Sequence, residues 1–232
     1  MAESNDQWEH YVAVRDRFIT LMRSLDDAQA NTTVPMCPDW TVVGVAAHAC
    51  GLNLDLTNGM REGLGSDEST ARQVADRADC TLEEICVEWL GYDAEMKAIS
   101  DEIPLLATRL AGDLVVHLHD VQHALGHDID RHDDASTEAA HRYVEVFQQR
   151  LGELLGIGAT VELSDGTTFP AHPELEDSGL VLQATPFDFV RSYTGRRSRR
   201  QVESLLWSAD PTIILDEAWG PYGDFQVTDI ED

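Results

Sequence analysis

The sequence has 232 residues with 43 acidic and 16 basic side chains, which gives a formal net charge of -27. Because such a chain repels phosphate groups, we expect neither nucleic acid nor an anionic membrane surface as a partner. The four cysteines form no CxxC pair, no basic and apolar leader is evident, and no apolar run is long enough to cross a bilayer, so we predict a cytoplasmic protein.

Apolar residues recur at helical spacing in the first part of the chain and predict four helices, over residues 7–27, 41–56, 81–90 and 103–126. Thr41 is a residue type that caps helix N-termini, and Thr81 with Glu84 forms a capping box at the start of the third helix. Prolines interrupt the pattern before Thr41, and "GLGSDEST", residues 63–70, predicts a loop. Helices joined in this way indicate a four-helix bundle.

The pattern changes in the later part of the chain. We expect a helix, a β-hairpin, a strand and a further helix there, over residues 136–155, 159–169, 179–185 and 186–207. An Asp-Gly pair favours the hairpin turn, and Pro186 suits the first position of the last helix. We therefore predict a mainly α fold, with a helical bundle over residues 1–156 and a smaller α+β domain over residues 157–232.

The stretch "GDLVVHLHDVQHALG", residues 112–126, holds three of the nine histidines of the chain. An α-helix turns by about 100° per residue, so Asp113, His117 and Asp120 form one stripe within or beside the face that carries the core leucines. On the same wheel His119 and His123 point away from that face. We expect these two histidines on the outer face of the helix.

A carboxylate and a histidine one turn apart on an inward face need a partner for their charge. A divalent cation is such a partner, and His48, in the apolar segment "VVGVAAHACG", is the best candidate for a third ligand. His48, Asp113 and His117 would leave coordination positions open, as in catalytic zinc sites. The alternative is that Asp113 and His117 only hydrogen-bond to each other and that His48 is an ordinary core histidine.

Three segments resemble the mycothiol-dependent maleylpyruvate isomerase family. "MCPDWTVVGVAAHACG" is similar to a Cys-Pro-x-Trp-Thr-Val…His segment of that family, and "DLVVHLHDVQHALG" is similar to its second signature. "TPFDFVRSYTGRRSRRQVESLLW" followed by "SADP" resembles the C-terminal part of many members. The resemblance implies a DinB-like four-helix bundle whose metal ligands are His48, Asp113 and His117. One departure is that a glutamate is expected in the isomerase where this chain has Asp113.

The resemblance also implies an activity, in which mycothiol binds the metal as a thiolate and reacts with an electrophilic small molecule, by isomerisation or S-transfer. Zinc is the first expectation for the metal, and nickel, manganese and iron suit the same ligands. Asp120 is a candidate partner for an imidazole ligand. The alternative is a non-catalytic bundle that binds a metal or senses a ligand. We expect the thiol and a small electrophile as partners, and a monomer or a homodimer.

The cluster "GRRSRR" contains four of the 16 basic residues. Arginine binds carboxylates in a bidentate manner, so the cluster is a candidate for contact with an anionic substrate. Arg196 is our candidate catalytic residue, because its Gly-Arg pair lies inside the third resembling segment. The alternative is that these arginines form ion pairs with acidic residues of the same chain. Cys37 and Cys50 are predicted to be packing residues and not nucleophiles, and Trp40 is predicted to be a core anchor or to line the cavity.

Overall fold

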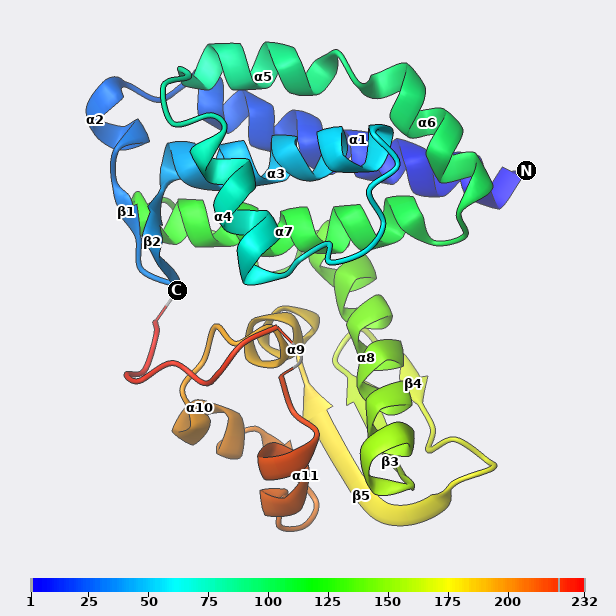
Figure 1. Cartoon of the computed structure of the whole chain (residues 1–232). Coiled ribbons are helices and arrows are strands. Elements are labelled where there is room, and N and C mark those ends of the chain that lie inside the picture. Colours follow the sequence, from blue (N-terminus) through cyan, green and yellow to red (C-terminus); the bar gives the residue numbers. More distant parts are fainter. Residues whose placement is uncertain (1, 221, 232) are drawn as a thin grey trace. The chain divides into compact units, whose positions relative to one another are not determined.

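The computed structural model describes residues 2–220 and 222–231. It contains two compact units, Met1–Ile129 and Asp130–Asp232 (Figure 1). The first unit is helical apart from one short hairpin, and the second combines helices with a four-stranded sheet. The predicted fold class, a mainly α protein with a helical bundle and a smaller α+β part, is confirmed.

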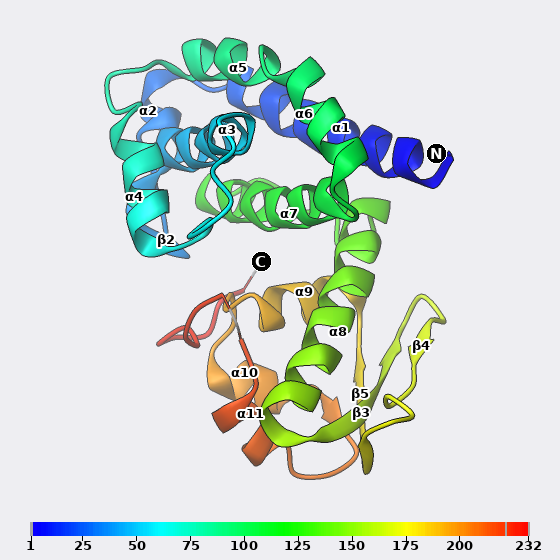
Figure 2. The same ribbon diagram turned by 45° about the vertical axis from the view of Figure 1, so that its right-hand side comes forward.

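The first unit is a bundle in which α1 and α3 each pack against α5, α6 and α7. Its helices are α1 (Ala2–Arg23), α2 (Asp27–Ala30), α3 (Val42–Thr57), α4 (Asp67–Ala75), α5 (Leu82–Leu90), α6 (Asp93–Glu102) and α7 (Leu106–Ala124). The short helices α5 and α6 follow one another and together form the fourth side of the bundle (Figures 1 and 2). Among the described helices, none combines the length and the hydropathy that crossing a lipid bilayer requires.

Local capping explains where the bundle helices begin. The Thr41 side chain accepts a hydrogen bond from the backbone N–H of Gly44 at the start of α3, as the sequence predicts. The capping box of Thr81 and Glu84 is present at the start of α5. Directly before α3, the strands β1 (Thr33–Val34) and β2 (Cys37–Thr41) form an antiparallel pair. Strand β2 therefore leads straight into the helix that carries His48.

Helix α4 begins inside the segment for which the sequence predicts only a loop. Ser66 caps it by accepting from the backbone N–H of Ser69, and Asp67 and Glu68 lie in its first turn, where negative charge favours the N-terminus of a helix. The helix lies beside α3 (Figures 1 and 2). The loop prediction for residues 67–70 is wrong because these residues form the first turn of a helix that Ser66 caps.

The second unit is built around a mixed sheet with strand order β4-β3-β5-β6. Its elements are α8 (Asp134–Leu155), β3 (Ile157–Leu163), β4 (Thr168–Phe169), β5 (Glu176–Ala184), α9 (Pro186–Tyr193), α10 (Arg199–Glu203), β6 (Leu206–Trp207) and α11 (Thr212–Glu217). The predicted hairpin is confirmed as the antiparallel pair β3–β4, and β5 is parallel to β3. Pro186 occupies the first turn of α9, as predicted.

Two features of the second unit differ from the prediction. Helix α8, which we place in the bundle from the sequence, belongs to this unit because it packs on α9 and β3 and its Phe147 contacts Trp219 with ring centroids 5.3 Å apart. The helix predicted over residues 186–207 is interrupted at Gly195, whose φ of 78° is a left-handed conformation that favours glycine. Ser198 then caps the separate helix α10.

Candidate metal centre

The structure brings His48, Asp113 and His117 together, the first from α3 and the other two from α7. Nε2 of His48 lies 4.0 Å from Oδ2 of Asp113, and Nε2 of His117 lies 3.8 Å from Oδ1 of Asp113. All three ligand-type atoms lie within 4.8 Å of one another. The two histidine side chains are 7% exposed and that of Asp113 is 42% exposed, so the group is buried on one side and open to solvent on the other.

The chemistry of these donors suits a divalent cation. Ligand atoms about 2.1 Å from a tetrahedral ion are about 3.4 Å apart, so the two measured separations to Asp113 are about 0.5 Å longer than such an ion requires. Burial disfavours the charged imidazolium of His117, but the Asp113 carboxylate, then Asp120 and Cys37, outweigh burial and raise the pKa of His117 to about 10. The same negative charges also attract a metal cation, which displaces the proton from the imidazole when it binds.

A second group shares His117 through its other ring nitrogen. Cys37, His117 and Asp120 also place ligand-type atoms within 4.8 Å of one another, and Nδ1 of His117 lies 3.6 Å from Oδ2 of Asp120. Asp120 is fully buried, and Cys37 comes from strand β2. The prediction that Asp120 lies beside an imidazole of the site agrees with this geometry.

Trp40 lines the candidate centre. Its ring centroid lies 5.0 Å from that of His48 and 6.2 Å from that of His117, and its side chain is half-buried. Of the two roles that the sequence leaves open, a core anchor or a residue of the cavity wall, the wall position agrees with these contacts. Strand β2 thus supplies both Trp40 and Cys37 to the neighbourhood of the two histidines.

The predicted outer-face position of His119 is wrong. His119 is 1% exposed, and His123 is half-buried. Helix α7 packs against α1, α3 and β1, so residues 110–121 are all buried except Asp113. The helical wheel separates the two histidines from the Asp113 stripe, but it does not reveal that α7 has neighbours on more than one side.

Sequence reasoning missed Gln73, which contacts His48, and Asp55, which contacts Gln73. Gln73, on α4, is fully buried with Oε1 2.7 Å from Nδ1 of His48, and its Nε2 donates to Oδ2 of Asp55 at 2.6 Å. The signal that identifies α4 is Ser66 followed by two acidic residues, a typical helix start. Recognition of that start would have placed Gln73, for which we predict no element from the sequence, on a helix.

The cysteine beside His48 in sequence is not suited to act as a nucleophile. Cys50 is fully buried, and burial raises the pKa of its thiol to about 12 against the opposing effect of Arg77. At neutral pH this thiol stays protonated, and the thiolate is the reactive form. This agrees with the prediction that Cys50 is a packing residue.

The arginine cluster lies in the second unit, and two of its members form the ion pairs that the sequence leaves as an alternative. Arg199 pairs with Glu203 and Asp216, and Arg200 pairs with Asp229. Arg196 is half-buried in the turn before α10, where its Nη1 donates to the carbonyl oxygen of Thr194 at 2.5 Å. Its predicted catalytic role stays a prediction.

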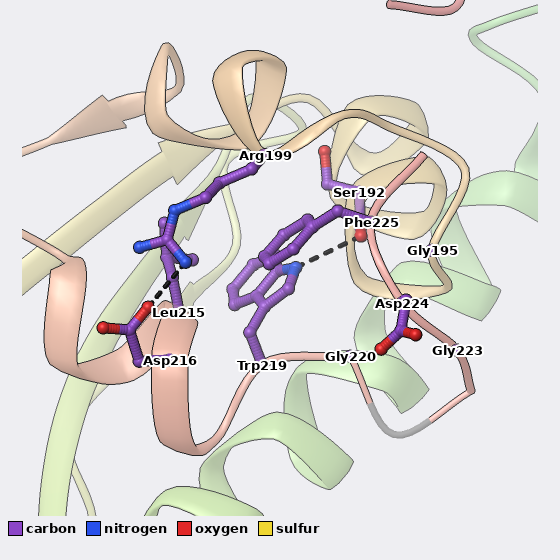
Figure 3. Close-up of a pocket in the computed structure, with 10 residues that line it drawn as sticks. All are labelled: Ser192, Gly195, Arg199, Leu215, Asp216, Trp219, Gly220, Gly223, Asp224 and Phe225. Carbon is purple, nitrogen blue, oxygen red and sulfur yellow. Dashed lines mark hydrogen bonds and ion pairs between the residues drawn. The ribbon is translucent and has the colours of Figure 1, made fainter. Parts of the chain in front are cut away.

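The second unit also contains a cavity of about 380 Å³ (Figure 3). Its lining residues are Ser192, Gly195, Arg199, Leu215, Asp216, Trp219, Gly220, Gly223, Asp224 and Phe225. Nη1 of Arg199 lies 2.5 Å from Oδ1 of Asp216, and Nε1 of Trp219 donates to the Ser192 carbonyl oxygen at 3.2 Å. Because Glu203 also pairs with Arg199, two carboxylates neutralise this guanidinium and the cavity does not present it to an anionic ligand.

Comparison with known proteins relates the chain to one family. Residues 11–104 match the family model of the mycothiol maleylpyruvate isomerase N-terminal domain, a segment that includes His48 and ends before α7. No curated protein matches the chain. A crystal structure of mycothiol-dependent maleylpyruvate isomerase is 16% identical to this chain, with a TM-score of 0.51. The aligned region covers 89% of this chain and 93% of the isomerase chain.

A second crystal structure, of a histidine-to-alanine mutant of the mycothiol-dependent maleylpyruvate isomerase, has 14% identity and a TM-score of 0.57, with the same coverage of both chains. At identities this low, the likeness to the two structures shows the fold. The family match over residues 11–104 contains the first of the three segments and supports the resemblance to this family.

Proposed function

We propose that this chain, whose residues 11–104 match the model of the mycothiol maleylpyruvate isomerase N-terminal domain, is a metal-dependent enzyme that uses a low-molecular-weight thiol of the mycothiol type. The observation that carries the proposal is the convergence of two imidazole nitrogens and one carboxylate, from His48, His117 and Asp113. We propose one divalent ion at these residues. Zinc is the first candidate, and nickel, manganese and iron suit the same ligands.

In this proposal each residue of the site has its own role. A bound divalent cation stabilises a thiolate over a thiol and so supplies a nucleophile at neutral pH. His48 and His117 hold the ion from the buried side, and Asp113 holds it where the site meets solvent. The thiol and an electrophilic small molecule therefore approach from the side of Asp113, with the Trp40 ring beside them. The reaction is an isomerisation or an S-transfer to the electrophile.

The metal part of the proposal is tested by elemental analysis of the full chain purified without chelators. We expect about one zinc, nickel, manganese or iron ion per chain, and its loss in His48→Ala and in His117→Ala. His123→Ala is the matched control, because His123 is a half-buried histidine on the same helix as His117. The proposal fails if the unaltered chain contains no stoichiometric ion or if both site variants keep it.

The catalytic part is tested by turnover of maleylpyruvate and of a panel of electrophiles with and without mycothiol. We expect turnover that requires the thiol and that disappears in His48→Ala and after chelation. Asp113→Glu restores the residue expected in the family isomerase and should keep both the ion and the turnover, whereas Asp113→Ala should lose them. A chain that binds one ion but shows no thiol-dependent turnover is the non-catalytic bundle that the sequence leaves as the alternative.

A further inference from the structure

The buried side chains of Asp55, Gln73 and His48 form a line of contacts, which reaches His48 at Nδ1. Nδ1 of His48 lies 2.7 Å from Oε1 of Gln73, and Nε2 of Gln73 donates to Oδ2 of Asp55 at 2.6 Å. Gln73 is 0% exposed and Asp55 is 1% exposed. His48 and Asp55 are both on α3, two turns apart, so Gln73 of α4 spans the gap between two residues on one face of that helix.

The chemistry of these groups allows one direction of hydrogen bonding. An ionised carboxylate only accepts hydrogen bonds, so the amide NH₂ of Gln73 must face Asp55 and its carbonyl oxygen must face His48. A carbonyl oxygen also only accepts, so Nδ1 of a neutral His48 must carry the proton. Nε2 then has the lone pair, and this is the nitrogen that faces Asp113 at 4.0 Å.

At the end of this line of contacts away from His48, Asp55 pairs with Arg72. Nη2 of Arg72 donates to the same oxygen of Asp55 at 2.7 Å, which gives the buried carboxylate a charged partner. The side chain of Arg72 is 38% exposed and also reaches Asp76, with Nη1 3.5 Å from Oδ2. The exposed arginine therefore keeps a negative charge buried next to Gln73.

The close approach of Gln73 to α3 depends on a glycine. A Cβ atom at Gly51 would lie 2.6 Å from Cβ of Gln73 and 2.9 Å from Nη1 of Arg77. Arg77 also holds α4 in place, because its Nη1 donates to the Gln73 carbonyl oxygen at 3.2 Å and its Nε donates to Glu88 at 2.9 Å. Gly51 and Arg77 thus both keep Gln73 close to α3.

We propose that Gln73 and Asp55 are positioning residues that hold His48 as the tautomer protonated at Nδ1, with the Nε2 lone pair directed to the metal centre. This inference rests on the proposed function for its purpose, but the tautomer itself is a property of the chain without metal. Partners of this kind orient a histidine ligand and typically contribute about 10- to 100-fold to metal affinity.

The test is the substitution Asp55→Asn, which keeps the shape of the side chain and removes its strict acceptor character. An asparagine can donate to Oε1 of Gln73, so the Gln73 amide is free to turn and offer its NH₂ to His48. We expect ¹⁵N NMR of the metal-free full chain at pH 9 to show His48 protonated at Nδ1 before the substitution and a large rise in the Nε2-protonated form after it. We also expect Zn²⁺ binding, measured by competition with a chelating dye, to weaken by about 10- to 100-fold.

Asp76→Asn is the matched control, because it removes the other carboxylate partner of Arg72 and leaves the line of contacts intact. It should change neither the His48 tautomer nor the Zn²⁺ affinity. Gln73→Met is a second variant, which introduces no charge and removes the side-chain amide. It should also increase the fraction of His48 that is protonated at Nε2. Circular dichroism checks that each variant is folded.

The two proposals fail in different ways. A His48 ring protonated at Nε2 in the unaltered chain, or the same tautomer in folded Asp55→Asn and Gln73→Met as in the unaltered chain, would overturn the positioning role. If the tautomer shifts as expected but the unaltered chain binds no Zn²⁺, the positioning of His48 stands and the proposed metal-dependent function fails.

Discussion

Nδ1 of His117 lies 3.6 Å from Oδ2 of Asp120, on the ring edge opposite to the one that faces Asp113. Asp120 is 0% exposed, whereas the Asp113 side chain is 42% exposed. His117 therefore lies between one carboxylate that meets solvent and one that is fully buried. The two carboxylates have different places in the site, and we predict different roles for them.

We predict that Asp120→Asn weakens Zn²⁺ binding without abolishing it. The buried carboxylate lies 3.6 Å from Nδ1 of His117, where its negative charge favours a proton on Nδ1 and so leaves the Nε2 lone pair to the ion, a contribution of about 10- to 100-fold in affinity. Competition with a chelating dye measures the change. Asp128→Asn, an exposed aspartate just after α7, is the control and should bind as the unaltered chain does. Equal affinity in both variants would show that Asp120 does not support the ligand.

The two candidate ligand groups predict opposite results for Cys37→Ser. An ion held by His48, Asp113 and His117 does not need the thiol, so we expect Cys37→Ser to keep one ion per chain and His48→Ala to lose it. An ion held by Cys37, His117 and Asp120 would give the reverse pattern. Elemental analysis of the two variants, purified side by side without chelators, separates these sites. Cys80→Ser, also a half-buried cysteine, is the control for removal of a thiol.

Local sequence signals identified the three side chains that the bundle brings together in the candidate centre. The caps at Thr41 and Thr81 are where a simple hydrogen-bond rule places them. Asp113 and His117 share a face because residues four apart lie one above the other on any α-helix. A polar residue in an apolar helix identified His48. The convergence of these residues is thus a consequence of helical spacing and bundle packing.

The role of Gln73 and the burial of His119 depend on tertiary contacts, which the hydrophobic periodicity of the sequence does not reveal. Gln73 is one polar residue on a short and largely polar helix, and its importance comes only from the approach of α4 to α3 at Gly51. The burial of His119 depends on how many elements surround α7. A helical wheel identifies which residues share a face, but tertiary packing decides which faces are covered.

Two glycines of α3 should respond in opposite ways to alanine. At Gly51 the added Cβ would lie 2.6 Å from Gln73, whereas at Gly44 its nearest neighbour would be Trp40 at 3.3 Å. Alanine gains about 1 kcal/mol over glycine within a helix, and a core clash costs about 1–3 kcal/mol. We expect Gly51→Ala to lower the free energy of unfolding by up to about 2 kcal/mol and Gly44→Ala to leave it unchanged or raise it.

Urea denaturation followed by circular dichroism measures both changes. Because Gly51→Ala also displaces the Gln73 side chain, its Zn²⁺ affinity should fall with its stability, whereas Gly44→Ala should keep its affinity. A Gly51→Ala chain that is as stable as the Gly44→Ala chain would show that α4 moves away from α3 at little cost, and the close approach would then not hold Gln73 in place.

Arg196 is the residue for which we predict an effect on substrate selectivity. Its guanidinium suits a carboxylate, and hydrogen bonds to charged groups contribute about 1.5–3 kcal/mol, so Arg196→Ala should lower kcat/KM for a carboxylate-bearing electrophile by about 10- to 100-fold. A neutral ester of the same electrophile should be affected little. Arg196→Lys keeps the charge without the bidentate geometry and should recover part of the loss.

Kinetics with the acid and the ester distinguish this role from a structural one. Nη1 of Arg196 also donates to the Thr194 carbonyl oxygen, so a purely structural arginine would lower turnover of both compounds equally. Arg200→Ala is the control, since the Arg200 side chain is 81% exposed and pairs with Asp229. A selective loss for the acid in Arg196→Ala, with Arg200→Ala unchanged, supports carboxylate binding by Arg196. An equal loss for acid and ester contradicts it.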